Sequence, residues 1–422
     1  MMIRTKPSDP IGLLRMIYLR KIVTQAGLAD EINLSRSFVN SMVQDLREAG
    51  LLRVVGTEES RSGRRRVLFE MNPDLAHLVG VDLGTANLRI VLTDLLGRTL
   101  SSKRIPSCLA EGRDCVLKRI HAEIRSLLEQ DSKVEGIGIS QSGVINHRTG
   151  ELLSWPKVPG WRNVLLKHIF ETEHGLPTVV DDSARTMAVA EQHFGQGQGV
   201  DEFLHVSIGV GIGAAIFTSG KLHYGSDGFA GELGHITIDE HGEICSCGNR
   251  GCLEVCASAG AIISQARTRL QKGVDSLLFQ LVEGNLERIS VETVVEAAQA
   301  GDKLSMMILK EAAEHLGTAL ADVVNLLNPK KIILGGAVPK TAGKFLTEPL
   351  LVTIRERALP QVTQNLEVSI SNLSDESAAV GAAILAAESL VLSDTSLRQL
   401  TGGRSVGRVM PHGTASRKAI PE

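Results

Sequence analysis

The sequence is poor in aromatic residues, in cysteine and in long apolar runs. Aromatic side chains make up 3% of the 422 residues, and six cysteines are present. No apolar run approaches the roughly 20 residues that a membrane-spanning helix needs. The N-terminal residues also lack the apolar segment and cleavage site of a signal peptide. So few cysteines do not form a disulfide framework, and we therefore expect a cytoplasmic protein without a membrane segment.

Length and charge indicate several domains with different partners. A chain of 422 residues exceeds what one core supports, so two or three domains are expected. Residues 1–71 contain 12 Lys/Arg and 8 Asp/Glu, a balance of 12 − 8 = +4. The remaining residues carry 45 − 12 = 33 positive and 48 − 8 = 40 negative side chains, a balance of −7. This asymmetry suggests that only the N-terminal segment meets a polyanion.

Three of the six cysteines lie within eight residues, at Cys245, Cys247 and Cys252, and His235 stands ten residues upstream. Three thiolates and one imidazole make a closed tetrahedral shell, the usual form of a structural zinc site. The alternative is that these are buried free cysteines, which behave as small apolar side chains. Because the neighbouring residues are Glu, Ser, Gly, Asn and Arg, the sequence favours a Zn²⁺ site over a core.

Residues 25–50 predict a helix-turn-helix. A short apolar pattern ends near Asn33, and Ser35 is a favourable N-cap for a second helix that Gly50 terminates. In this arrangement the second helix lies in the major groove of double-stranded DNA. The polar residues on its leading face are the candidates for contacts with bases or phosphates: Arg36, Ser37, Asn40 and Ser41.

A wing is expected after these helices. Residues 51–55 and 66–70 alternate as two strands around a loop that contains Arg61, Arg64 and Arg65, and these cations suit DNA phosphates. The alternative is a helical hairpin used for packing, followed by a solvated run of charge. The N-cap, the wing and the basic balance together favour a winged helix-turn-helix DNA-binding domain over residues 1–71.

The segment GELGHITIDEHGEICSCGNRGCLE, residues 231–254, resembles the signature of the ROK family of sugar kinases and sugar-responsive repressors. The resemblance extends over roughly residues 10–390. It implies that His235 binds zinc while its loop faces a sugar, and that Glu232 and Glu254 bond sugar hydroxyls. The family fold implied is an α/β two-lobed, actin/hexokinase-like (ribonuclease H-like) body behind an all-α/winged helix-turn-helix head.

An internal repeat agrees with this resemblance. Residues 77–100 read as two strands around a glycine-containing turn, and residues 203–222 repeat the design. The expected boundaries are lobe 1 at 72–195, completed by 375–392, and lobe 2 with the zinc site at 196–374. Beyond these, residues 393–422 lack periodicity and are expected to form a disordered tail.

The phosphate-binding motif of the family's kinases is altered. In those kinases the first turn resembles D-x-G-G-T, whereas this chain reads Asp82-Leu83-Gly84-Thr85-Ala86. A side chain at Thr85 obstructs the close backbone approach that phosphate needs, and Ala86 removes a hydroxyl. Val210 stands where the kinases usually place threonine in the second hairpin. These changes disfavour the use of ATP.

The catalytic motif is also altered. The kinase pattern N-D-x-N-A-x-A-x-x-E, counted back from Glu191, places Asp182 at the asparagine, Ser183 at the catalytic aspartate and Arg185 at the second asparagine. A serine without a neighbouring base cannot accept the sugar proton near neutral pH. A shift of one residue would return Asp182 to the catalytic position, and capping of the following helix is a further alternative. We predict that Asp182 contacts the sugar.

These patterns together predict a sugar-responsive transcriptional regulator, most simply a repressor, rather than an enzyme. Its partners would be operator DNA, a sugar or sugar-phosphate effector, and a second copy in a homodimer or homotetramer. The alternative is an ATP-dependent hexose or N-acetylhexosamine kinase with an accessory DNA-binding head. A third possibility is that a protein partner, rather than a sugar, controls the head.

Overall fold

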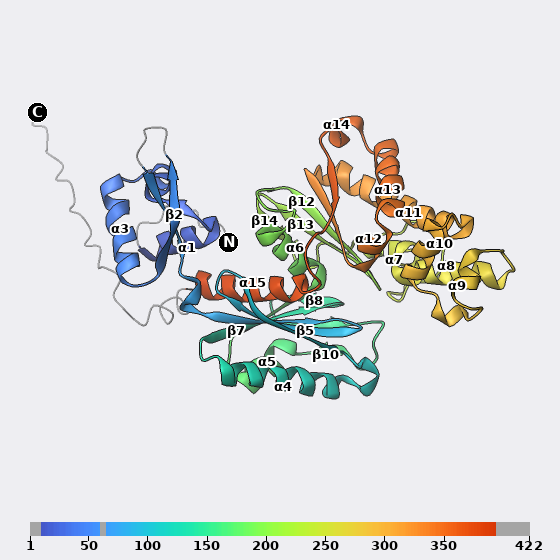
Figure 1. Cartoon of the computed structure of the whole chain (residues 1–422), viewed down its shortest axis with the longest axis horizontal. Helices are drawn as coiled ribbons and strands as arrows, with labels where there is room; N and C mark the ends of the chain where they lie inside the picture. Colours follow the sequence, from blue (N-terminus) through green and yellow to red (C-terminus); the bar gives the residue numbers. More distant parts are fainter. Residues whose placement is uncertain (1–9, 60–64, 394–422) are drawn as a thin grey trace, which may run out of the picture. The chain divides into compact units, whose positions relative to one another are not determined.

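The computed structural model describes residues 10–59 and 65–393, which fall into two compact units (Figure 1). The first contains the described residues up to His77, together with Asp94–Leu96 and the described residues from Ala387 onward. The second contains Leu78–Thr93 and Gly97–Ala386. Arg61, Arg64 and the expected tail from residue 394 lie outside the described residues.

The first unit contains three helices and a small antiparallel sheet. The helices are α1 (Pro10–Arg20), α2 (Gln25–Ile32) and α3 (Arg36–Glu48), and the sheet has the order β1 (Val23–Thr24), β3 (Arg65–Met71), β2 (Leu52–Glu59). Thr24 and Ser35 cap α2 and α3, since their side chains accept hydrogen bonds from Gly27 N and Phe38 N. Asn33 ends α2 in the left-handed region at φ 54°. The two helices and the hairpin that the sequence predicts are therefore present.

The second unit is built on two five-stranded sheets. The first has the order β11 (Thr178–Asp182), β7 (Val134–Gln141), β4 (His77–Leu83), β5 (Asn87–Asp94), β6 (Thr99–Pro106). The second has the order β16 (Glu367–Ile370), β15 (Lys331–Gly335), β12 (Phe203–Ile208), β13 (Ile212–Thr218), β14 (Lys221–His223). Numbered along the chain within each half, both sheets read 5-4-1-2-3. The internal repeat predicted from the two glycine hairpins is confirmed, and with it the two-lobed fold.

Helices cover both faces of the first sheet (Figure 1). α4 (Arg113–Gln130) and α5 (Leu166–His174) lie on one face, and α15 (Ser377–Leu392) lies on the other. α15 approaches the strands closely, because a Cβ at Gly80 would stand 2.0 Å from the carbonyl oxygen of Ala379, and one at Gly138 would stand 1.9 Å from that of Ala382. Only glycine fits at these two strand positions. A three-stranded side sheet has the order β10 (Arg162–Val164), β9 (Glu151–Ser154), β8 (Val144–Asn146).

One apolar cluster joins the two lobes. It contains Val91 from the first sheet, Phe203 and Ile333 from the second, Ala188 from α6 (Ser183–Phe194) and Ala379 from α15. The remaining helices belong to the second lobe: α7 (Leu253–Ala257), α8 (Ala259–Gln271), α9 (Leu277–Leu281), α10 (Val291–Gln299), α11 (Lys303–Leu327), α12 (Ala337–Ala342), α13 (Lys344–Arg357) and α14 (Pro360–Thr363). Across the described part of the chain, no helix is both long and apolar enough to span a bilayer.

Candidate ligand-binding cleft and metal centre

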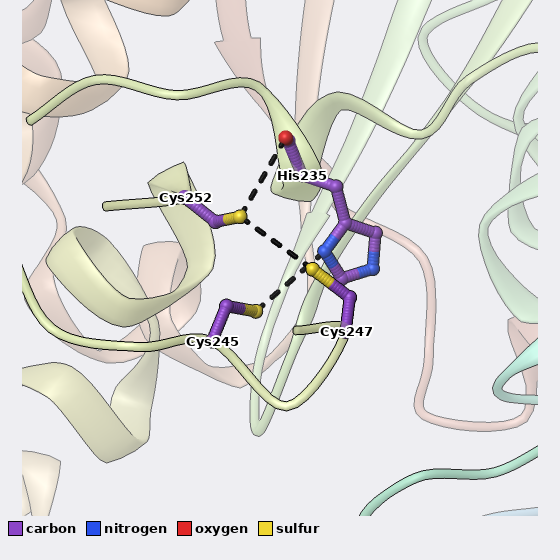
Figure 2. Close-up of side chains that lie close together, drawn as sticks. All are labelled: His235, Cys245, Cys247 and Cys252. Carbon is purple, nitrogen blue, oxygen red and sulfur yellow. Dashed lines mark hydrogen bonds between the residues drawn. The ribbon is translucent and has the colours of Figure 1, made fainter. Parts of the chain in front are cut away.

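His235, Cys245, Cys247 and Cys252 converge on one point (Figure 2). Their candidate ligand atoms all lie within 4.8 Å of one another. Cys245 Sγ is 3.7 Å from His235 Nδ1, and Cys247 Sγ is 3.7 Å from Cys252 Sγ. The sequence predicted this set, and the structure brings all four side chains together. The cluster could hold a metal ion.

The loop between β14 and α7 is held by short backbone contacts and by Leu233, which is buried in the apolar core of the second lobe. Isolated bridges join Thr237 to Cys252 and Ile244 to Arg250. A Cβ at Gly251, which has φ 65°, would stand 1.5 Å from the carbonyl oxygen of Asp239, so glycine is required where the chain turns back. These contacts place the three thiols around the imidazole of His235.

The electrostatics of the cluster favour a bound cation. Burial, together with the neighbouring thiols of Cys247 and Cys245, raises the pKa of Cys252 to about 12. Several thiolates at such separations repel one another unless a cation lies between them. A divalent ion that prefers sulfur and nitrogen ligands would remove this repulsion.

A cleft of about 1280 Å³ between the two lobes of the second unit contains all four residues predicted to bind a sugar: Asp182, Glu232, His235 and Glu254. His235 belongs both to the cysteine cluster and to the lining of the cleft. Its Nδ1 faces the sulfur atoms, and Figure 2 shows the other ring nitrogen pointing away from them. An imidazole that binds a metal through Nδ1 keeps Nε2–H as a donor for a ligand.

Asp182 and Ser183 stand at the junction of β11 and α6. Asp182 caps the helix by accepting a hydrogen bond from Ala184 N at 2.8 Å. Burial raises the pKa of Asp182 to about 7, Arg185 opposes the rise, and Asp181 and Glu232 add to it. Asp182 therefore caps the helix and also lines the cleft, and its contact with a sugar stays a prediction.

Ser183 has no general base beside it in the described part of the chain. Its Oγ lies 3.2 Å from Ser142 Oγ, and both residues line the cleft. A hydroxyl whose neighbour is another hydroxyl is not activated as a base or nucleophile. The position that the gap-free comparison gives to the kinase aspartate is thus chemically passive.

The sequence analysis did not anticipate two basic residues of the cleft. Lys157 Nζ lies 2.8 Å from Glu254 Oε1 and donates to the carbonyl oxygen of Val210 at 2.7 Å. Arg185, which is 3% exposed, donates to Asp181 Oδ1 at 3.0 Å. The Lys157–Glu254 pair joins distant segments and has no local signal. Asp181 and Arg185 stand four residues apart, a spacing that could have indicated their pair.

The cleft region that corresponds to the kinase phosphate turn is bridged by the chain's own charges. Arg89 Nη1 lies 3.0 Å from Asp82 Oδ2, and Arg89 Nη2 lies 3.9 Å from Asp375 Oδ2. Lys340 Nζ approaches the other oxygen of Asp375 at 3.4 Å. Burial raises the pKa of Asp82 to about 6, against the lowering effect of Arg89. Thr85, Ala86 and Val210 line the same cleft.

The predicted DNA-contacting residues of the second helix lie on one exposed face of α3. These are Arg36, Ser37, Asn40 and Ser41. The opposite face is buried through Val39, Met42, Val43 and Leu46. Gln44 is exposed on the same face as Asn40, one turn further along, and its i+4 spacing could have added it to the prediction. Arg65, at the start of β3, is exposed as well.

Comparison with known proteins agrees with this architecture. Residues 78–389 match the family model of the ROK family. The chain belongs to the ROK family.

A repressor of this family is similar to most of the chain. The xylose repressor of Caldicellulosiruptor bescii is 30% identical over 92% of this chain and 96% of its own length.

Two solved ROK structures are also similar. One is a ROK family transcriptional regulator, a homologue of the E. coli MLC protein, with 31% identity, a TM-score of 0.74 and coverage of 90% of this chain and 95% of its own. The other is the ROK glucokinase of Streptomyces griseus in complex with glucose and AMPPNP, with 30% identity and a TM-score of 0.66, covering 74% of this chain and 99% of its own.

The extent of these matches separates the two kinds of ROK relative. The match covers 99% of the glucokinase chain but only 74% of this chain. The xylose repressor accounts for 92%, which must include part of the residues that precede the family match at residue 78. The additional similarity therefore falls on the unit that carries α1–α3 and the β2–β3 hairpin.

Proposed function

We propose that this ROK protein is a sugar-responsive transcriptional repressor. The observation that carries the proposal is that similarity to repressors of the family runs through the N-terminal unit as well as the body. Ser35 caps α3, the β2–β3 hairpin follows it, and one face of α3 is polar and exposed. This is the arrangement in which a recognition helix enters the major groove of DNA. Arg36, Ser37, Asn40 and Ser41 would contact bases or phosphates, and the wing residues Arg61, Arg64 and Arg65 would contact phosphates.

The body would bind its effector without phosphorylating it. Ser183 has a hydroxyl neighbour in place of a base, and Arg89 with Asp82 and Asp375 spans the region of the phosphate turn. A serine at the position of the kinase aspartate and paired charges at the phosphate turn disfavour phosphoryl transfer. Asp182, Glu232, His235 and Glu254 would instead contact the hydroxyls of a sugar or sugar derivative.

A structural Zn²⁺ would complete this site. Three thiolates and one imidazole nitrogen match the donor set of a closed tetrahedral zinc shell. Burial and the neighbouring thiols raise the pKa of Cys252, and a divalent cation would offset this cost to the thiolate. The ion would fix the loop between Glu232 and Glu254. The sugar-binding residues of that loop would then depend on the ion for their position.

Regulation would follow from linkage. A sugar that binds two states of the protein with different affinity shifts their populations, with coupling of typically about 1 to 3 kcal/mol. The proposed assembly is a homodimer or homotetramer in the cytoplasm, since two heads on a two-fold axis would match a palindromic operator.

Selection from a random library of double-stranded DNA tests the proposal. The zinc-loaded full chain should enrich a palindromic sequence, and one of D-xylose, D-glucose or N-acetyl-D-glucosamine should change its affinity for that sequence at least about fivefold. The absence of any enriched sequence would contradict DNA binding, and an affinity that none of the sugars changes would contradict the sugar response.

The second candidate, an ATP-dependent hexose or N-acetylhexosamine kinase, is favoured by the similarity of the body to the Streptomyces griseus glucokinase. A coupled assay of ADP formation with the same three sugars distinguishes the two. Turnover at ordinary kinase rates, about 1–100 s⁻¹, would establish the kinase. We expect no sugar-dependent ADP formation.

A further inference from the structure

Lys157 places a cation within the proposed sugar pocket, although it belongs to none of the motifs above. Its ammonium bonds Glu254 Oε1 at 2.8 Å and the carbonyl oxygen of Val210 at 2.7 Å. Glu254 Oε2 accepts a hydrogen bond from Ile212 N at 3.1 Å. An ammonium carries three N–H donors, and these contacts use two of them. The third is available on the side of the cleft that Lys157 lines.

Lys157 adds a donor to the pocket beside the Nε2–H of His235. A sugar hydroxyl both donates and accepts, whereas the Glu254 carboxylate that pairs with Lys157 only accepts. Arg185 is 3% exposed, and its guanidinium is bonded to Asp181 and to the carbonyl oxygens of Gly228 and Ala230. Lys157 provides a charge-assisted donor directly beside an acceptor.

The segment that carries Lys157 is held rigidly. Trp155 N donates to the carbonyl oxygen of Trp161 at 3.0 Å, and Val158 N donates to that of Trp155 at 2.9 Å. The two indole rings pack edge to face with centroids 5.6 Å apart, and both are buried. A loop fixed in this way presents its lysine with little loss of conformational freedom when a ligand binds.

The charges of the cleft point to an uncharged ligand. Four of its cations are each paired with a carboxylate: Lys157 with Glu254, Arg185 with Asp181, Arg89 with Asp82 and Lys340 with Asp375. A phosphate group placed beside one of these four cations would have to break its pair and leave a carboxylate without its partner. Breaking a pair in this way is costly.

We propose that Lys157 is a specificity-determining ligand contact, and that Lys157 and Glu254 together bind a vicinal diol of a neutral, unphosphorylated monosaccharide. One hydroxyl donates to the Glu254 carboxylate, and the adjacent hydroxyl accepts from the Lys157 ammonium. This inference rests on the proposed function, since it assumes that the cleft binds a sugar.

Calorimetric titration of the zinc-loaded full chain tests it, with D-xylose, D-glucose, N-acetyl-D-glucosamine and D-glucose 6-phosphate as probes. The sugar that binds wild-type protein should lose about 10- to 100-fold in affinity in Lys157→Met, the range of a hydrogen bond to a charged group. Lys157→Arg should recover part of the loss. The matched control is Lys167→Met, since Lys167 is similarly exposed in the same lobe and pairs with Glu171 outside the cleft.

A double variant tests the shared diol. If Lys157 and Glu254 bind adjacent hydroxyls of one ligand, Lys157→Met and Glu254→Gln should together weaken binding less than the product of their separate effects. If the loss of affinity in the double variant equalled the product of the two single losses, the two residues would not bind adjacent hydroxyls of one ligand. Wild-type affinity or tighter binding in Lys157→Met would overturn the lysine contact, and stronger binding of D-glucose 6-phosphate than of D-glucose would overturn the neutral ligand class.

The same titrations separate this inference from the proposed function. Wild-type protein that binds none of the four probes would contradict the sugar response and this inference together. Wild-type binding that Lys157→Met leaves intact would contradict only the inference. Thermal unfolding of each variant monitors the fold, and Lys157→Gln serves as the replacement if Lys157→Met fails to fold.

Discussion

Arg185 Nη1 donates to Asp181 Oδ1 at 3.0 Å in a part of the body where both side chains are almost fully buried. Tyr224 Oη donates to the second oxygen of the same carboxylate at 2.8 Å. Arg185 Nη2 donates to the carbonyl oxygen of Gly228 at 2.8 Å. The buried charge is thus paired and hydrogen-bonded, and it ties α6 to the segment that precedes Glu232.

Replacing Arg185 should strongly destabilise the protein. Arg185→Met leaves Asp181 buried without its cation, so the free energy of unfolding should fall by about 3 to 5 kcal/mol. Urea denaturation followed by circular dichroism measures the change. Lys310→Met, which breaks the exposed pair with Glu314, is the control and should cost less than about 1 kcal/mol. If Arg185→Met lowered the free energy of unfolding by less than about 1 kcal/mol, the buried pair would not stabilise the fold as stated.

Asp182 should make stability fall as pH rises. Because its pKa is raised from 3.8 to about 7 in the folded protein, the protonated form is favoured there. The stability that this group contributes is fully present below about pH 4 and is lost as pH rises through about 7. Asp182→Asn removes the titration while keeping the shape. The difference in unfolding free energy between wild type and Asp182→Asn should therefore decline from pH 4 to pH 8, and a difference independent of pH would be the contrary result.

Metal analysis should give one zinc ion per chain for wild-type protein. Cys247→Ser should lose the ion, because three ligands bind zinc far more weakly than a complete tetrahedral shell. Sugar affinity should fall with it, while the far-ultraviolet circular dichroism of the sheets should remain. Cys115→Ser alters an exposed cysteine outside the cluster and should retain both zinc and sugar binding. Full zinc content in Cys247→Ser would exclude this ligand set.

The two parts of the proposed DNA surface should respond differently to substitution. Asn40→Ala should cost about 1 to 3 kcal/mol at the selected sequence and relax specificity there. Arg65→Ala should weaken binding to all sequences alike and reduce the slope of log affinity against log salt by about 1. Fluorescence anisotropy at several salt concentrations measures both effects, with Lys103→Ala on the body as the control. Unchanged affinity in Arg65→Ala would show that the wing does not contact DNA.

The sequence predicted the parts of the structure that depend on local patterns. The caps at Ser35 and Asn33, the two glycine hairpins and the cysteine motif each require particular residues at short spacing, so they are visible without coordinates. The common strand order of the two sheets followed from recognising the hairpin at residues 203–222 as a repeat of that at 77–100.

The contacts that complete the cleft could not be predicted in this way. Lys157 meets Glu254 across 97 positions of the chain, and Arg89 meets Asp375 across 286, so only the fold brings them together. The wing loop was expected at residues 56–65, but β2 continues to Glu59 and β3 begins at Arg65, because hairpin pairing extends the strands into the charged segment. Composition alone does not set where such a ladder ends.

The duplicated sheets reveal that the metal loop is an addition to one half of the body. In the first half, residues 107–112 alone connect the third strand to the next α-helix, α4, whereas residues 224–252 fill the equivalent place in the second half. The longer connection is nevertheless built into its lobe, because Leu233 is buried in the apolar core and Gly228 and Ala230 accept hydrogen bonds from Arg185. The cysteine-bearing segment is therefore an elaboration of one repeat whose base is fastened to the duplicated scaffold.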